Sequence, residues 1–304
     1  MNRQMESIEL SDLKYCPVCG RPERKALYPI PRSTVYQCRS CRLRYIDPCL
    51  SPDSMQSAYE SDESLTKLHQ FHDGYYDYGD LKVASKTSSD FKQALALVEK
   101  NISDSEKARA IFDVGYGNGL FLGLARERGW QVYGVDSSAK NQELARKKFS
   151  LDLACGDFDH HDNRGITFDA ISFWDVIEHF PNPYAALKKA RQMLKPDCLI
   201  FIGIPNDRSL LGFISTVLCR LSFGLVKKGI EMVYILEHVA YYNLKTLNEL
   251  LRRNGFSPCE HFYTSTDLEK YDLSGSEKFL ARIILLLGKI TALQNRLVGV
   301  WRKG

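Results

Sequence analysis

The segment from Ile111 to Leu122, IFDVGYGNGLFL, places three glycines at alternate positions directly after an apolar run that contains an acid near its end. An apolar run, a glycine turn and a helix-forming segment in this order predict a strand, a tight loop and a helix, whose main-chain N–H groups can approach a ligand closely. Asp136 follows Gly115 by 21 residues, at the expected end of a second strand. A carboxylate there can accept both hydroxyls of a ribose, so the spacing predicts a nucleoside site.

The glycine spacing and a nearby acid indicate which nucleoside this is. The glycines follow G-x-G-x-G and not the G-x-G-x-x-G pattern of nicotinamide and flavin binders. Asp113 lies two residues before the first glycine, where a carboxylate would repel a pyrophosphate and favour a cation. An adenosine with a positively charged tail fits both observations, and S-adenosylmethionine is such a molecule. The alternative is that the glycines only allow close packing of the backbone.

Two further segments follow at matching distances: CGDF at Cys155–Phe158 and FDAISFWDVIEHFPNP at Phe168–Pro183. With them, the region from about Phe91 to Thr266 resembles the class I S-adenosylmethionine-dependent methyltransferases. The resemblance implies an α/β fold, a Rossmann-like doubly wound sheet of about seven strands. It also implies an enzyme whose cofactor is contacted by Asp113, Gly115, Tyr116, Gly117, Gly119, Asp136, Ser137, Asp157, Phe158 and Asp175. Tyr116 departs from the family pattern, where a small residue or Cys is common, and an aromatic ring could either crowd the cofactor or stack on it.

Two C-x-x-C pairs near the N-terminus have the spacing of metal ligands. Cys16 and Cys19 form the first pair, and Cys38 and Cys41 form the second, with 18 residues between the pairs. Each turn points two sulfurs at one centre, and four thiolates make a closed tetrahedral zinc site. A redox dithiol is the alternative, and it would need a single pair at the start of a helix. We therefore predict a zinc-ribbon module over residues 1–50, folded by a structural zinc, with Cys49 outside the ligand set.

Methyl transfer to a hydroxyl requires that the acceptor be oriented and its proton removed. His179 and His238 are the candidate catalytic residues. Asp175, Glu178 and His179 would share one face of a helical turn. Together with His238 they resemble the Glu/His cluster of small-RNA 2′-O-methyltransferases and, more loosely, that of ubiquinone-pathway O-methyltransferases, which implies a second, divalent metal. The alternative is that these side chains only orient the loop or the methionine part of the cofactor.

The order of the predicted elements divides the rest of the chain. Residues 51–104 are expected to be a helical connection that covers the cofactor, with a helix at Ser51–Glu60, an aromatic loop at His69–Asp80 and a helix at Ser89–Ile102. Residues 105–270 are expected to be the methyltransferase core, with a lid insertion at 207–236, and residues 271–304 a C-terminal helix. Alternating strands and helices predict a parallel sheet. The strands are predicted at Ala110–Val114, Gln131–Val135, Asp152–Cys155, Ala170–Phe173, Cys198–Ile204 and near Phe256–Thr264, and the helices at Leu120–Arg128, Ala139–Phe149, Tyr184–Lys195 and before Gly255.

The insertion contains an apolar run, Ser209–Val226, with a single charged residue, Arg220. The run is too short and too interrupted by glycine to span a bilayer. We expect a buried helical hairpin that packs against an apolar helix at Phe279–Trp301, or a homodimer contact. The alternative is peripheral membrane contact, with Lys227, Lys228 and basic residues spaced seven apart in the C-terminal helix facing anionic headgroups.

The composition narrows the classes of function. The chain has 304 residues, of which 44% are hydrophobic and 26% charged, and a net charge of +4. This modest bias argues against a nucleic-acid partner. Nine cysteines with no apolar export segment predict free thiols and metal in the cytoplasm.

A zinc ribbon ahead of this core resembles bacterial methyltransferases of sugar, polysaccharide and natural-product modification. That resemblance implies transfer to a hydroxyl or amine of a sugar, a glycan intermediate or a small metabolite. The alternatives are an RNA methyltransferase, acting on an rRNA base or on a 2′-hydroxyl, and a non-catalytic S-adenosylmethionine-binding module.

Overall fold

The computed structural model describes residues 9–51, 53–55, 81–102, 109–266, 268 and 274–304. Five parallel strands form the centre of the molecule: β6 (Ala110–Val114), β7 (Gln131–Asp136), β8 (Ala154–Cys155), β9 (Phe168–Trp174) and β10 (Leu194–Pro205). They pair in the order β10-β9-β6-β7-β8. Their carboxyl ends therefore lie at one edge of the sheet, where open α/β sheets bind ligands.

Two antiparallel strands complete a sheet of seven. They are β12 (Phe256–Thr264) and β13 (Arg296–Lys303), and β13 lies between β10 and β12. The full order is β12-β13-β10-β9-β6-β7-β8. The predicted α/β class and seven-stranded, doubly wound sheet are thus confirmed.

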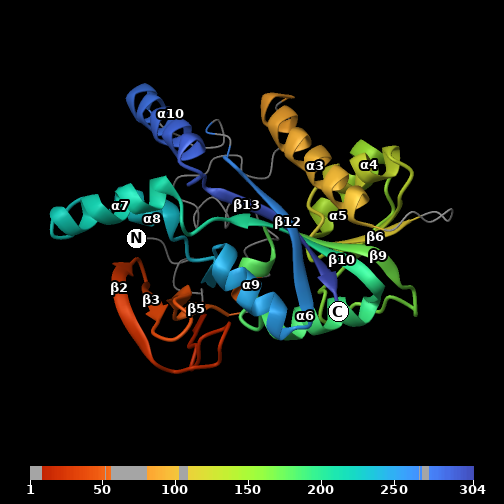
Figure 1. Cartoon of the computed structure of the whole chain (residues 1–304), viewed down its shortest axis with the longest axis horizontal. Helices are drawn as coiled ribbons and strands as arrows, with labels where there is room; N and C mark the ends of the chain where they lie inside the picture. Colours follow the sequence, from red (N-terminus) through yellow and green to blue (C-terminus); the bar gives the residue numbers. More distant parts are fainter. Residues whose placement is uncertain (1–8, 52, 56–80, 103–108, 267, 269–273) are drawn as a thin grey trace.

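Helices cover both faces of this sheet (Figure 1). One face carries α3 (Leu81–Asn101), α4 (Leu120–Glu127) and α5 (Ala139–Phe149), and the other carries α6 (Pro183–Met193) and α9 (Leu244–Arg253). Three of these helices have a side-chain cap at their N-terminus. Ser138 caps α5, Asn182 caps α6 and Asn243 caps α9, and each side chain accepts a backbone N–H from the first turn of its helix. The prediction that α6 continues to Lys195 is wrong, because Leu194 already pairs with Phe168 as the first residue of β10.

The predicted C-terminal helix over Phe279–Trp301 is also wrong in its second half. The helix α10 spans Gly275–Ile290, and the chain then turns into β13. Because β13 has a neighbouring strand on each side and is buried, its sequence is a continuous apolar run without the alternation of a half-exposed strand. Arg282, Lys289 and Arg296 therefore do not share a helical face, since Arg296 lies in β13.

The N-terminal module is a β-structure that is continuous with the core. Its strands β2 (Arg24–Ile30), β3 (Ser33–Cys38) and β4 (Arg44–Asp47) form an antiparallel sheet, and a short pair joins β1 (Leu10–Ser11) to β5 (Cys49–Leu50). A fourth strand, β11 (Ala240–Tyr241), comes from the region after the lid insertion and pairs with β4. The module thus shares a sheet with the core.

The lid insertion forms α7 (Leu210–Leu221) and α8 (Lys228–Val233). The helix α7 contacts α10, as expected, but the expected burial is wrong: the outward side chains of both helices are exposed. Within the described part of the chain, no helix is both long and apolar enough to cross a bilayer. Most of the predicted helix at Ser51–Glu60 and the aromatic loop at His69–Asp80 lie outside the described residues.

Candidate active site

The glycine loop follows β6 at the carboxyl edge of the sheet, where it was predicted. Gly115, Gly117 and Gly119 all have positive φ, at 69°, 55° and 83°. A Cβ at Gly115 would lie 2.5 Å from Val176 Cγ2, whereas a Cβ at Gly117 would meet nothing within 4 Å. The loop therefore packs tightly at Gly115 and leaves open space beside Gly117, where a ligand can approach the backbone.

The Asp136 carboxylate connects this loop to the end of β7. Its Oδ2 accepts the Gly117 N–H at 2.9 Å, and its Oδ1 accepts the Ser138 N–H at 2.9 Å and Asn141 Nδ2 at 3.1 Å. Asp136 is buried, and burial raises the pKa of its carboxyl, while the donated hydrogen bonds oppose that shift. The residue predicted to bind the ribose thus also holds the loop in place. Ser137 lies between Asp136 and the Ser138 cap and is partly exposed.

Asp113 lies beneath the loop. It is 1% exposed, and Ser172 Oγ donates to its Oδ1 at 2.6 Å. Burial raises the pKa of Asp113 to about 8, and the Ser172 hydrogen bond partly opposes this. A carboxyl in such an apolar position is a strong site for a nearby positive charge.

The Tyr116 side chain points into the core. The ring is 4% exposed, and the hydroxyl donates to the Ala154 carbonyl at 3.0 Å. A Cβ at Gly134 would lie 3.0 Å from Tyr116 Cδ1, so the ring covers the β7 backbone. We therefore expect Tyr116 to support the loop between β6 and β8 and not to stack on the cofactor.

Asp157 and Phe158 follow β8. Asp157 is exposed, accepts the Asp159 N–H at 3.1 Å and lies 3.0 Å from His160 Nδ1. Phe158 is buried and packs against Phe112 and Phe173. The Asp157 carboxylate is thus accessible at the carboxyl edge of β8, whereas the Phe158 ring belongs to the core.

Asp175 follows β9 with a φ of 54°, a conformation that residues other than glycine rarely adopt. Arg296 Nη2 of β13 donates to both of its carboxylate oxygens at 2.8 Å. The sequence did not indicate this pair, because Arg296 was placed on a helix. The structure thus separates Asp175 from the cluster of possible metal ligands that was predicted to include it.

The other three members of that cluster do come together. Glu178 and His179 lie in the 3₁₀ turn η2 (Ile177–His179), and His238 comes from the segment before β11. One possible ligand atom of each lies within 4.8 Å of the others, and the two imidazole rings are 4.8 Å apart. Because Val176 contacts Gly115, this turn adjoins the glycine loop.

The protonation of these groups follows from burial. His179 Nδ1 donates to the Glu237 carbonyl at 2.9 Å, which leaves Nε2 as the nitrogen that can accept a proton or bind a metal. Burial lowers the pKa of His179 to about 4, and it raises the pKa of Glu178 well above its ordinary value and that of Glu237 to about 7. Glu178 is 2% exposed, and among the described residues its carboxylate oxygens have no hydrogen-bond partner.

The four predicted cysteine ligands also converge. Their sulfurs all lie within 4.8 Å of one another, with Cys16 Sγ 3.5 Å from Cys41 Sγ and Cys19 Sγ 3.4 Å from Cys38 Sγ. Each C-x-x-C turn is followed by a residue with positive φ, Gly20 (65°) after the first and Arg42 (69°) after the second. Cys49 lies apart from this group, with its Sγ 3.9 Å from Ser11 Oγ.

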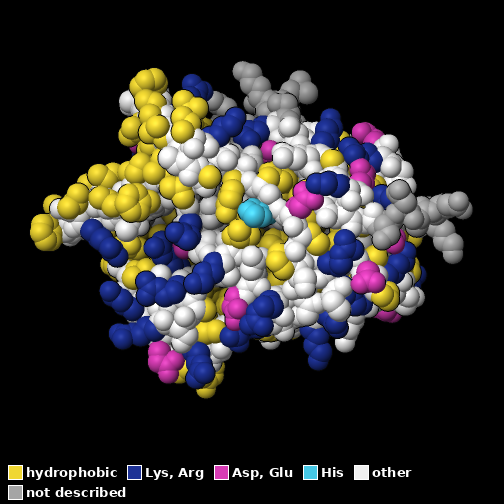
Figure 2. All heavy atoms as spheres, viewed as in Figure 1, with side chains coloured by type: hydrophobic (Ala, Val, Ile, Leu, Met, Phe, Trp, Pro, Cys, Tyr) yellow, Lys and Arg dark blue, Asp and Glu magenta, His cyan; other side chains and the backbone are white. Residues whose placement is uncertain are grey.

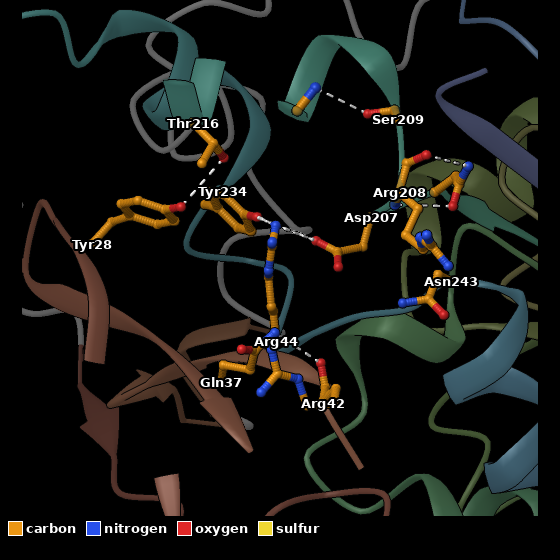
Figure 3. A network of polar contacts seen from close by, with 12 residues as sticks. Tyr28, Gln37, Arg42, Arg44, Asp207, Arg208, Ser209, Thr216, Tyr234 and Asn243 are labelled. Carbon is orange, nitrogen blue, oxygen red and sulfur yellow. Dashed lines mark hydrogen bonds and ion pairs between the residues drawn. The ribbon is translucent and has the colours of Figure 1, made fainter. Parts of the chain in front are cut away.

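A polar network joins the N-terminal module to the lid insertion, and Figure 3 shows its side chains converging between the two. Arg44 Nη1 of β4 pairs with Asp207 Oδ1 at 3.2 Å and donates to the Tyr234 hydroxyl, which itself donates to Asp207. Tyr28 of β2 donates to Thr216 Oγ1 of α7 at 3.3 Å, and its ring stacks on Tyr234. The sequence did not indicate this junction, whose residues lie up to 190 positions apart.

A cavity of 560 Å³ lies between the carboxyl end of β10, the start of α9 and the end of α10. Its lining includes three basic side chains, Arg208, Lys245 and Arg252, together with Asn206 and Asn243. Glu249, the acid of the lining, pairs with Arg252 and Arg253. The cavity is thus net basic, and its lining exposes more apolar than polar surface.

Comparisons with known proteins agree with this geometry. A family model described as a methyltransferase domain matches residues 87–261, which is more than half of the chain. A ubiquinone biosynthesis O-methyltransferase of Idiomarina loihiensis is 29% identical over 136 residues, which are 43% of this chain and 56% of that protein. The chain thus spans about half the length of the curated relatives it matches.

Two solved structures share the fold. Magnesium protoporphyrin IX methyltransferase from Synechocystis PCC 6803 with bound SAH has a TM-score of 0.55 and 14% identity, and the match covers 84% of this chain and 100% of that one. A plantazolicin methyltransferase in complex with SAH has a TM-score of 0.52 and 19% identity, and the match covers 82% and 94% of the two chains.

Proposed function

The chain belongs to the methyltransferase domain family, and we propose that it transfers the methyl group of S-adenosylmethionine to a hydroxyl of a small molecule. The observation that carries this proposal is the glycine loop, held open beside Gly117 by the Asp136 carboxylate at the carboxyl edge of the sheet. When bound, the sulfonium supplies an activated methyl group. The chain must bind the adenosine, stabilise the positive charge and orient the acceptor.

The residues divide these tasks between them. Asp136 accepts the ribose hydroxyls, and the exposed Asp157 carboxylate accepts the adenine amino group. The cationic tail favours the ionised form of Asp113, which then provides the opposing negative charge. The Asp175–Arg296 ion pair, which is partly shielded from solvent, fixes the turn that follows β9. That turn carries His179, whose Nε2 would take the acceptor proton if no metal is bound there.

The acceptor class follows from the cavity and the relatives. Three basic side chains in the 560 Å³ cavity favour an acceptor with a phosphate or carboxylate group. The relative from Idiomarina loihiensis is an O-methyltransferase, which favours oxygen over nitrogen as the methylated atom. We therefore place anionic sugars, glycan intermediates and hydroxylated metabolites first.

Methyl transfer from radiolabelled S-adenosylmethionine tests this proposal. The purified protein is incubated with nucleotide sugars, phosphorylated glycans, phenolic acids and total RNA, and the labelled product is separated by class. Label in an anionic small molecule is the expected result. Label in RNA alone would support an RNA methyltransferase instead, and cofactor binding with no transfer to any class would indicate a binding module.

Glu178, His179 and His238 are proposed to hold a divalent cation that lowers the pKa of the acceptor hydroxyl. A buried carboxylate without a hydrogen-bond partner is costly, and a cation within reach of Glu178 would offset that cost. The Nδ1–H of His179 donates to a backbone carbonyl, which is the usual arrangement behind a metal-bound Nε2. Titration of Mn²⁺ or Zn²⁺ into Glu178→Gln should show a lost site, whereas the control Glu143→Gln, at an exposed residue of α5, should retain it.

The four cysteines are proposed to bind one structural zinc. Tetrahedral ligands about 2.3 Å from zinc lie about 3.8 Å from one another. Sulfur separations of 3.4 and 3.5 Å are close to that edge length. Elemental analysis should find one zinc per chain that is lost in Cys16→Ser/Cys38→Ser and kept in the control Cys49→Ser.

A further inference from the structure

Most of the exposed large apolar side chains lie in two helices and in the segments that follow them. In the described part of the chain, 15 large hydrophobic side chains are exposed, and 13 of them lie in residues 213–226 and 279–293. They belong to α7, the loop that follows it, α10 and the turn after it, and we call this surface the α7–α10 face. Figure 2 shows it as hydrophobic side chains gathered on the two projecting helices.

α7 buries small side chains and exposes large ones, and α10 buries Ile284 and Gly288. The buried positions of α7 are Gly212, Ser215 and Thr216, whereas Phe213 and Leu221 are 64% and 74% exposed. In the loop after α7, Phe223 and Leu225 are 96% and 89% exposed. α10 likewise exposes Phe279 and Ile290, at 67% and 74%. Exposed apolar surface of this extent is unfavourable in water and indicates a binding partner.

The charges at this face indicate which partner covers it. Residues 209–228 and 275–293 contain six basic residues: Arg220, Lys227, Lys228, Lys278, Arg282 and Lys289. Their one acid, Glu277, pairs with Lys228. A two-fold dimer through this face would bring the same cations together, which opposes self-association. An anionic surface with an apolar interior complements both features.

We propose that the α7–α10 face docks on an anionic lipid bilayer. The apolar side chains of both helices enter the boundary between headgroups and acyl chains, and the basic side chains contact the anionic headgroups. Neither helix can span the bilayer, so the contact is peripheral and reversible. The proposal does not depend on which acceptor is methylated.

Flotation with vesicles tests the proposal on the full chain. Vesicles of phosphatidylcholine alone are compared with vesicles that contain phosphatidylglycerol, at low and at raised salt. The expected result is binding to the phosphatidylglycerol vesicles that weakens as salt screens the basic residues. Phe223→Ser/Leu225→Ser should weaken binding about tenfold or more, because two of the most exposed apolar side chains are lost.

Control variants outside the α7–α10 face show whether vesicle binding depends on this face. Ile166→Ser, at an exposed apolar residue outside the face, should bind as the unchanged protein does. Arg220→Glu/Lys227→Glu should reduce binding to phosphatidylglycerol vesicles, while Lys25→Glu on the N-terminal module should not. A protein that remains with the soluble fraction for both lipids overturns the proposal. A dimer that Phe223→Ser/Leu225→Ser dissociates, without vesicle binding, would assign the face to a second copy instead.

Discussion

Asp136 holds the glycine loop and is proposed to bind the ribose, so a substitution would remove both contributions together. Its carboxylate accepts three N–H groups from the chain, one of them from Gly117, and it is proposed to accept the ribose hydroxyls as well. The sequence predicted the second function from the distance to Gly115. It could not predict the first, because the hydrogen bond to Gly117 depends on the positive φ of that residue.

Asp136→Ala should therefore weaken S-adenosylmethionine binding by more than the loss of the ribose contacts alone. Each charge-assisted hydrogen bond contributes about 1.5–3 kcal/mol, and the freed loop adds an entropic cost to binding. Asp136→Asn keeps one acceptor oxygen, so its S-adenosylmethionine affinity should lie between those of the unchanged protein and Asp136→Ala. Titration calorimetry measures the affinities, with the exposed Asp152→Asn as control. Unchanged affinity in Asp136→Ala would remove this residue from the site.

Asp113 should make the stability of the protein depend on pH. Because burial raises its pKa from the ordinary 3.8 to about 8, the folded chain holds this proton to higher pH than the unfolded chain does. The stability from the protonated form is complete below about pH 4 and is lost as the pH rises towards 8. Asp113→Asn keeps an acceptor for Ser172 but cannot ionise.

The free energy of unfolding of the unchanged protein and of Asp113→Asn is measured with denaturant at pH 5 and pH 8, without cofactor. The unchanged protein should lose more free energy of unfolding across this interval than Asp113→Asn does. Glu178 and Glu237 also have raised pKa values and shift both proteins alike, so the difference between the two proteins reports Asp113 together with its electrostatic effect on Asp136. Equal losses would mean that Asp113 is already ionised in the folded chain.

At the scale of elements, Arg44 of β4 connects the N-terminal sheet to the insertion. Asp207 is almost fully buried beneath it, and burial raises the pKa of Asp207 although Arg44 opposes that shift. Arg44→Met should destabilise the protein by about 2–3 kcal/mol, below the cost of breaking a fully buried pair, because Arg44 is partly exposed and Tyr234 still donates to Asp207. Denaturant unfolding measures this change.

A double-mutant cycle separates the ion pair from packing. Arg44→Met/Asp207→Asn should recover part of the loss, because no charge is then left buried without its partner. The exposed Lys25→Met on β2, in the same sheet but two strands away, should have little effect. If the double variant is no more stable to denaturant than Arg44→Met alone, the Arg44 stem stabilises the junction by packing and not by charge.

Local patterns predicted the elements whose limits are marked by local residues. β6 and α5 begin and end where predicted, because glycine and Ser138 mark their limits in the sequence. β13 was missed because a strand buried between two others has the same apolar run as a helix. The Arg44–Asp207 pair joins residues 163 positions apart, and no local pattern can indicate such a contact.

At the scale of the whole molecule, the N-terminal module is part of the main fold and not an appended unit. Cys16, Cys38 and Tyr45 belong to the same apolar cluster as Ile171 and Leu247 of the core. β11 continues the sheet of the module, and it lies directly after His238 of the candidate metal cluster. The sequence predicted a module folded by its metal but not this shared core.

Removal of zinc should therefore loosen more than residues 1–50. If the four cysteines hold zinc as proposed, its loss weakens the pairing of β4 with β11 and, with it, the Arg44 contacts to Asp207 and Tyr234. Chelation followed by hydrogen exchange should show faster exchange in β2–β4, β11 and α8. The strands β6, β7, β9 and β10 should remain protected, because most of the buried residues that pack with them belong to the sheet itself and to its covering helices, although residues of the module reach the same apolar cluster.

The same experiment on Arg44→Met with zinc bound supplies the control. This variant breaks the junction and leaves the metal site intact, so it should speed exchange in α8 but not in β2 and β3. If chelation changes exchange only within residues 9–50, the shared sheet transmits nothing to the insertion, and the module is an independent unit. If chelation speeds exchange in β6 and β10 as well, the cysteine site stabilises the entire sheet, and the protein folds only with its metal.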